Sequence, residues 1–149
     1  MKVTKGYADY ITFLFDDEQG SPIISNLLKE EVLIEKCICR VVDTITGYYE
    51  KRIEIKDSVI LRLDMYAAYI YGGLTITNSV IGYFRLMDGG YNREPIIIRN
   101  CVFLGEVDFD ESVLKNDIII EDCIFLKGHD FVEDIRYAVM KDEYFKVKI

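Results

Sequence analysis

Three aspartates recur in this chain at one and two repeats of an interval of 21 to 22 residues. Asp64 follows Asp43 by one interval, and Asp108 follows Asp64 by two. In a repeating fold such residues stack, which places the first two carboxylates roughly 5 Å apart, near the separation used by a retaining glycosidase. Arg85 falls in the same series and is expected to pair with them. We therefore interpret the column as an acidic face of ordinary solvated charge and not as a catalytic pair.

The other reactive residue types form no recognisable constellation. Zinc sites need two close pairs of ligands, but only Cys37 and Cys39 are close, while Cys101 and Cys123 stand apart. His129 is the sole histidine and has no nucleophile beside it in the sequence. A phosphate-binding glycine loop, an HExxH motif and a nucleophile elbow are all missing from the sequence. The sequence predicts no catalytic residue, no metal and no cofactor.

The length and composition of the chain exclude several classes of protein. The chain has 149 residues, of which 50% are hydrophobic, so it is long enough for one domain with a real core. Its formal net charge of −8 argues against direct nucleic-acid binding and leaves a basic partner open. We read no membrane span and no secretory signal, and four cysteines at core positions suit reduced thiols. These features predict a cytoplasmic protein.

An internal repeat decides the architecture. Segments of the form apolar-x-Ile begin at Val32, Ile53, Leu74, Ile96 and Ile118, and in each the Ile is followed two residues later by a corner residue and then by a Cys or Ser. Such an even period indicates one supersecondary unit stacked on itself. Within each interval, large residues recur about every five positions, as in Ile55, Ile60, Met65, Ile70 and Ile76. The same spacing places Tyr91 inward. Each coil therefore has four short sides.

The five-residue module resembles that of the pentapeptide-repeat family. The closest stretch is Val107-Asp108-Phe109-Asp110-Glu111-Ser112-Val113-Leu114, and the resemblance covers about residues 32–126. It implies a right-handed quadrilateral β-helix. Each coil is slightly longer than four five-residue modules, which departs from the family pattern. Some members are rod-like dimers that imitate duplex DNA, which supplies an alternative function: an acidic inhibitor of a DNA-binding enzyme such as a topoisomerase.

Both ends of the chain depart from the repeat. We divide the single domain into an N-terminal cap (1–31), the β-helix (32–126) and a C-terminal cap helix (127–149). Tyr7 to Phe15 reads as a strand, and Ser21-Pro22 as the start of a short helix that includes Leu27 and Leu28. An incomplete first coil is the alternative for residues 1–31. Asp130 and Glu133 resemble a capping box that opens a helix to about Tyr144.

Residues that face outward form columns, and the columns are candidate surfaces. One column is entirely β-branched and apolar: Ile38, Val59, Val80, Val102 and Ile124. Either a cap, a second copy in a homodimer or another protein is expected to cover it. Outward Tyr48 and Tyr69, with Tyr66 and Tyr71 nearby, form a possible aromatic contact patch. Polar residues at one corner predict a structural ladder: Lys36, Asp57, Asn78, Asn100 and Asp122.

The sequence as a whole predicts a protein without enzymatic activity that binds other proteins. It is expected to be an all-β, right-handed parallel β-helix presenting flat faces to a partner and to itself as a homodimer. The DNA-mimic inhibitor is the first alternative. A small polysaccharide-acting enzyme that uses Asp43 and Asp64 is the second.

Overall fold

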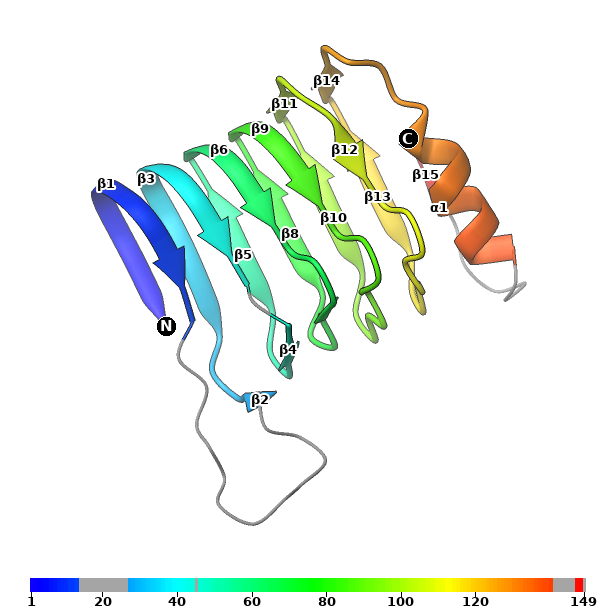
Figure 1. The fold of residues 1–149 in the computed structure, drawn as a ribbon, viewed down its shortest axis with the longest axis horizontal. Helices are drawn as coiled ribbons and strands as arrows, with labels where there is room; N and C mark the ends of the chain where they lie inside the picture. The colour runs from blue at the N-terminus through cyan, green and yellow to red at the C-terminus, as the bar shows by residue number, and fades with distance from the viewer. Residues whose placement is uncertain (14–26, 45, 141–146, 149) are drawn as a thin grey trace.

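The computed structural model describes residues 1–13, 27–44, 46–140 and 147–148 (Figure 1). The elements, in chain order, are β1 (Lys2–Thr12), β2 (Leu27–Leu28), β3 (Val32–Asp43), β4 (Gly47–Tyr49), β5 (Ile53–Lys56), β6 (Val59–Asp64), β7 (Ala68–Tyr69), β8 (Leu74–Thr77), β9 (Val80–Arg85), β10 (Ile96–Arg99), β11 (Val102–Phe103), β12 (Val107–Asp108), β13 (Ile118–Glu121), β14 (Ile124–Phe125), α1 (Phe131–Met140) and β15 (Val147–Lys148). Their arrangement is a parallel β-solenoid of about 4 turns with a small C-terminal helix, which confirms the predicted fold class.

Every strand pair is parallel, and the pairs join residues one coil apart. On the first side of the coil, β3, β5, β8, β10 and β13 lie side by side, so that Ile34, Ile55 and Ile76 stack in register. β3 continues around a corner onto the next two sides of the coil. There β6 pairs with the second part of β3, and β9 pairs with β6. The short strands β2, β4 and β7 build the fourth side. Equivalent residues therefore lie directly above one another, about 4.8 Å apart.

The inward columns form the core. Of the large residues that the five-residue spacing places inside, all but two are at most 2% exposed. One exception is Phe125 at the C-terminal end, which remains half-buried. The other is Tyr91, whose predicted inward position is wrong: its side chain is half-buried and its ring is tilted against that of Tyr69, while Asn92 is buried instead. The backbone N–H of Lys115 donates to Asn92 Oδ1 at 3.0 Å, so this buried amide is satisfied.

The predicted polar ladder at the first corner is present. Lys36, Asp57, Asn78, Asn100 and Asp122 all have a left-handed backbone, with φ between 50° and 55°. Asn78 Nδ2 donates to Asp57 Oδ1 at 3.2 Å, and Asn100 Nδ2 donates to Asn78 Oδ1 at 2.8 Å. Asn and Asp tolerate this conformation best among residues that carry a Cβ. The corner explains why these residue types follow each apolar-x-Ile segment.

Lys36 is the ladder residue least suited to its conformation. Replacing Lys36 with glycine is expected to raise the free energy of unfolding by about 1 kcal/mol, because glycine removes the left-handed penalty. Chemical denaturation would measure it. Thr77→Gly is the control, since Thr77 precedes the left-handed Asn78 in a strand and glycine there should destabilise by about 0.5–1 kcal/mol. If Lys36→Gly lowered the free energy of unfolding as much as Thr77→Gly does, the left-handed backbone at Lys36 would not carry the expected penalty.

The N-terminal segment continues the solenoid. β1 pairs with β3 in register along three sides of the coil, from Lys2 opposite Leu33 to Thr12 opposite Asp43. This pairing supports the incomplete first coil over a separate cap. Leu27 and Leu28 lie in strand β2 beside Tyr48 and Tyr49, so the prediction that they are helical is wrong. The rest of that predicted helix, including Ser21 and Pro22, lies outside the described residues.

Helix α1 closes the C-terminal end, as predicted. Phe131, Val132 and Ile135 are buried, and the Phe131 ring stacks on Phe109 with centroids 5.8 Å apart. The Phe125 ring lies 5.0 Å from Phe131, which covers the last inward column. The helix ends at Met140, and the predicted extension to Tyr144 falls outside the described residues. No helix in the described part of the chain is both long and apolar enough to cross a membrane.

Candidate interaction surfaces

The apolar column lies on the outside of the solenoid, as predicted. Val59, Val80 and Val102 are partly exposed, whereas Ile38 and Ile124 are 56% and 57% exposed. β1 adds a sixth member, because Tyr7 pairs with Ile38 and is 72% exposed. These six side chains stack in one unbroken series from the first coil to the last.

A second apolar column runs beside the first and escaped the sequence reasoning. Leu61, Leu104 and Leu126 are 52%, 41% and 61% exposed at the next corner of three coils. Gly82 occupies the coil between Leu61 and Leu104, where a Cβ would lie 2.1 Å from the carbonyl oxygen of Leu61. The glycine therefore lets two coils approach closely and leaves this corner flat. We call the two columns together the apolar strip: Tyr7, Ile38, Val59, Leu61, Val80, Gly82, Val102, Leu104, Ile124 and Leu126.

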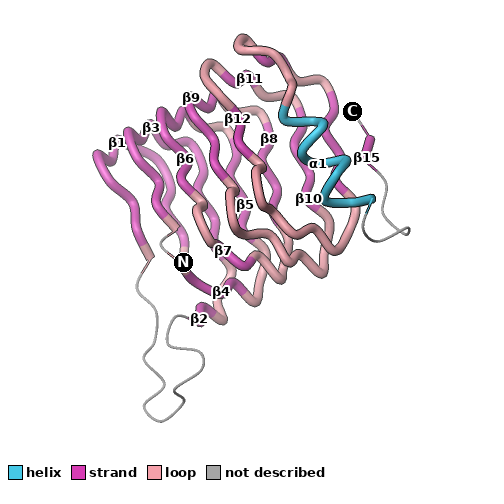
Figure 2. Tube along the Cα trace, turned by 45° about the vertical axis from the view of Figure 1, so that its right-hand side comes forward, coloured by secondary structure: helices cyan, strands magenta, loops and turns pink. Residues whose placement is uncertain are grey.

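Neither cap covers the apolar strip in the part of the chain that the structure describes. β1 lengthens the strip with Tyr7, and α1 lies at the end of the solenoid, against Phe109 and Phe125 (Figure 2). The predicted alternative in which a cap buries the column is therefore wrong for β1 and α1. The polar ladder of Asp57 and its equivalents borders the strip on one side. On the other side lies a mixed column in which Arg62 stands between Val41 and Tyr83.

The acidic column is neutralised by arginine at its centre. Asp43, Asp64 and Arg85 are consecutive in the register, and Asp108 follows Arg85. Arg85 Nε donates to Asp64 Oδ1 at 2.9 Å and Arg85 Nη2 donates to Asp64 Oδ2 at 2.7 Å. Arg62 Nη2 donates to the same Oδ2 at 2.8 Å. The expected pairing of Arg85 is thus present, and both oxygens of Asp64 are engaged.

This pairing sets the charge state of Asp64. Burial alone would raise the pKa of Asp64, but the hydrogen bonds from Arg85 and Arg62 outweigh it and lower the pKa below its ordinary value of 3.8. A general acid near neutral pH needs a raised pKa instead. Asp43 Oδ2 accepts from the Tyr10 hydroxyl at 2.8 Å. The column therefore has the chemistry of a structural ion-pair network.

A tyrosine ladder follows the fourth side of the coil. The rings of Tyr48 and Tyr69 stack with centroids 4.7 Å apart, and Tyr91 lies 4.8 Å from Tyr69. Tyr71 flanks both Tyr48 and Tyr69, and the Arg93 guanidinium lies 4.4 Å from the Tyr71 centroid. Burial raises the pKa of Tyr69, as do the neighbouring tyrosines, so its hydroxyl stays neutral at physiological pH. The ladder is an aromatic surface whose edge carries tyrosine hydroxyl groups.

Tyr66 does not join the tyrosine ladder. Its ring lies under Arg85, whose guanidinium is 4.9 Å from the ring centroid, on the side that carries the acidic column. The predicted aromatic patch therefore contains Tyr48, Tyr69 and Tyr71. It also contains Tyr91, which the sequence predicted to point inward.

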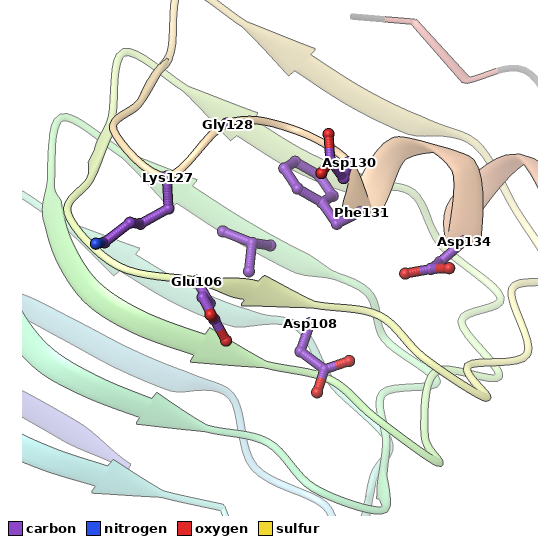
Figure 3. Close-up of a pocket in the computed structure, with 8 residues that line it drawn as sticks. Glu106, Asp108, Lys127, Gly128, Asp130, Phe131 and Asp134 are labelled. Atoms are coloured by element: carbon purple, nitrogen blue, oxygen red, sulfur yellow. The ribbon is translucent and has the colours of Figure 1, made fainter.

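An open pocket of about 360 Å³ lies between the last coils and the start of α1 (Figure 3). Its lining is acidic, with one lysine among four carboxylates: Glu106, Val107, Asp108, Lys127, Gly128, Asp130, Phe131 and Asp134. Burial raises the pKa of Asp134, as do the nearby carboxylates of Asp110, Asp108 and Glu133. Asp108 is thus the one residue of the predicted acidic face that lines this pocket.

The cysteines occupy structural positions. Cys37 and Cys101 lie in the same inward column as Ser58 and Ser79, and all four cysteines are free thiols. Cys101 Sγ donates to the carbonyl of Arg99 at 3.2 Å, as Ser79 Oγ does to Thr77 at 2.8 Å. Within residues 1–13, 27–44, 46–140 and 147–148, no group of three or more His, Cys, Asp or Glu could hold a metal ion.

Comparison of the chain with protein-family models, with curated proteins and with solved structures found no match. The surfaces described above therefore carry the functional argument.

Proposed function

We propose that this protein is a non-enzymatic protein–protein interaction module, that the apolar strip is its binding surface, and that a second copy of the chain is a partner for it. The observation that supports this is the unbroken apolar strip, which neither β1 nor α1 covers. An apolar surface of this extent normally meets another molecule.

The shape and border of the strip suit a protein surface. Six stacked residues span about 24 Å at the strand spacing, and sheets pack face to face at about 10 Å. Burying exposed apolar area contributes about 25 cal/mol per Å², so covering the strip stabilises a complex by several kcal/mol. An apolar centre with a polar rim is the usual anatomy of an interface. A flat strip is also complementary to itself under a two-fold rotation.

Membership in the pentapeptide-repeat family is part of the proposal. Its support is the four-sided coil, with a small Ser or Cys and a large apolar residue turned inward on the same side, as at Ser58 and Ile60. The coil length, slightly more than four five-residue modules, remains a departure from that family.

The two alternatives lack a comparable supporting observation. A DNA mimic needs a continuous acidic face, but Arg62 and Arg85 interrupt this one and pair with Asp64. A glycosidase needs one carboxyl with a raised pKa, whereas that of Asp64 is lowered. A topoisomerase supercoiling assay distinguishes the DNA mimic from the protein-binding module, because the module predicts no inhibition at micromolar protein.

Val80→Glu tests the strip. Val80 lies at its centre, and a buried glutamate without a partner should weaken self-association roughly 100-fold. Light scattering over a range of concentrations measures the assembly. Thr75→Glu is the matched control, because Thr75 faces outward on the neighbouring side of the same coil beside Arg52. An assembly unchanged by Val80→Glu, in a variant with wild-type circular dichroism, contradicts the proposal.

A further inference from the structure

The two ends of the solenoid differ. At the C-terminal end, α1 covers the last coil and β15 pairs with β13. At the N-terminal end, β1 pairs with β3 and with no other strand in the described part of the chain. An edge strand of 11 residues presents a row of unpaired N–H and C=O groups, which is a template for pairing with another strand.

The core is also less covered at this end. Val3 and Ala8 point inward, in register with Ile34 and Cys39. Ile34 and Cys39 are 0% exposed, whereas Val3 and Ala8 remain only partly buried. Among the residues that the structure describes, the outermost coil thus leaves both backbone edge and apolar side chains without the layer that every inner coil has.

The shape of β1 determines how a second copy fits. β1 follows three sides of the coil, and its first two arms, Lys2–Thr4 and Tyr7–Asp9, meet at a corner where Lys5 and Gly6 have φ of 61° and 127°. A two-fold axis through this corner, along the diagonal of the square coil, exchanges the two arms. Each arm then pairs antiparallel with the other arm of the second copy, and the two cores become continuous.

The residues that this symmetry brings together are compatible. Centring the axis between Lys5 and Gly6 places Val3 opposite Ala8 of the second copy, both inward, and Thr4 opposite its Tyr7, both outward. Lys2 then faces the carboxylate of Asp9 in the second copy, which Arg40 of that copy also binds at 2.7 Å. No like charges face each other along these two arms, whereas the exposed Lys5 side chains of the two copies lie near each other at the corner.

We propose that two copies join end to end through antiparallel pairing of β1, with their α1 caps at the outer ends. Because α1 closes the other end of each solenoid, the stacking stops at two copies and does not extend into a fibre. This contact uses the end of the solenoid, and of the residues of the apolar strip it involves Tyr7 alone.

Disulfide crosslinking at the corner tests the geometry. Lys5→Cys, made with Cys123→Ser to remove the one partly exposed native thiol, is expected to form a covalent dimer under mild oxidation. The two Lys5 positions would lie roughly 5 Å apart, within disulfide reach, whereas Lys36 positions one coil further in would lie about 15 Å apart. Lys36→Cys is therefore the matched control, since Lys36 is exposed, left-handed and directly beside Lys5 in the register. It should remain monomeric on a denaturing gel.

Two outcomes would overturn the end-to-end dimer: equal crosslinking of Lys5→Cys and Lys36→Cys, or no covalent dimer from Lys5→Cys. Adding Val80→Glu should leave the Lys5→Cys crosslink unchanged, which separates this contact from the strip. Ala8→Lys supplies a second measurement, because an inward charge on an edge strand blocks pairing. It should abolish the crosslink while circular dichroism stays that of the wild type.

Discussion

Replacing Phe103 with alanine is expected to lower the free energy of unfolding by about 3–5 kcal/mol. The Phe103 ring is fully buried and lies between Phe125, with centroids 5.0 Å apart, and Phe84, at 6.2 Å. The closely stacked coils on either side cannot collapse into the space that the ring leaves, so the cavity persists. Chemical denaturation followed by circular dichroism measures the loss, which is a large part of the roughly 5–15 kcal/mol that stabilises a typical domain.

Leu104→Ala is the control for Phe103→Ala. Leu104 is the next residue along the chain but points outward in the apolar strip and is 41% exposed. Its truncation should change the free energy of unfolding by less than about 1 kcal/mol, since surface positions contribute little to folding. Similar losses in the two variants would contradict the inward and outward assignment on which the surface columns depend.

Replacing Arg85 with alanine is expected to cost about 2–4 kcal/mol, the second largest effect. The variant removes both hydrogen bonds that Arg85 donates to Asp64, and Asp64 is only 7% exposed. A buried carboxylate that loses a bidentate partner keeps its desolvation cost, even though Arg62 still contacts one oxygen. Thermal and chemical denaturation at neutral pH measure the change.

Arg40→Ala is the matched control for Arg85→Ala. Arg40 also binds an aspartate through two nitrogen atoms, with Nε 2.7 Å and Nη2 3.0 Å from the oxygens of Asp9. Both side chains of this pair are more than half exposed, so its loss should cost far less than that of the buried pair. Equal costs in the two variants would show that burial of Asp64 does not set the strength of its ion pair.

The pH dependence follows from the pKa of Asp64. Because folding lowers this pKa below 3.8, the stabilising contribution of the carboxylate is present above that pH and is lost as the pH falls through the folded-state value. The difference in stability between wild type and Arg85→Ala should therefore narrow as the pH falls below about 3.8. A difference that stays constant from pH 7 to about pH 2 would contradict the assigned cause.

The inward columns were predictable because a side chain in a strand has only two directions and the period shows which residues share a direction. Ile55, Ile60 and Met65 follow the five-residue spacing and are fully buried. Tyr91 breaks the rule because Gly90 and Tyr91 both have a positive φ, of 98° and 52°, which interrupts the alternation of a strand. The Tyr91 ring therefore lies outside, and Asn92 points inward. The five-residue spacing does not show which corner accommodates the extra residues of a coil that is longer than four modules.

The candidate surface was only partly predictable for a related reason. The β-branched column is visible in the sequence because all five members share one residue type. The leucine column has the same spacing, but it begins with Arg40 and is interrupted by Gly82, so Leu61, Leu104 and Leu126 share no residue type with the rest of their column. The position of β1 depends on pairing across a sequence separation much longer than one coil, as between Lys2 and Leu33. No periodic signal could have placed it.

The polar corner ladder has a consequence for how such a protein changes length. Asp57 and Asn78 occupy the same point of successive coils, with the same left-handed backbone. Excising Ser58 to Asn78 would join Asp57 directly to Ser79, an identical junction to the one that it replaces. Evolution by unequal recombination at this corner can therefore shorten or extend the rod one layer at a time while the chemistry of each flank is preserved.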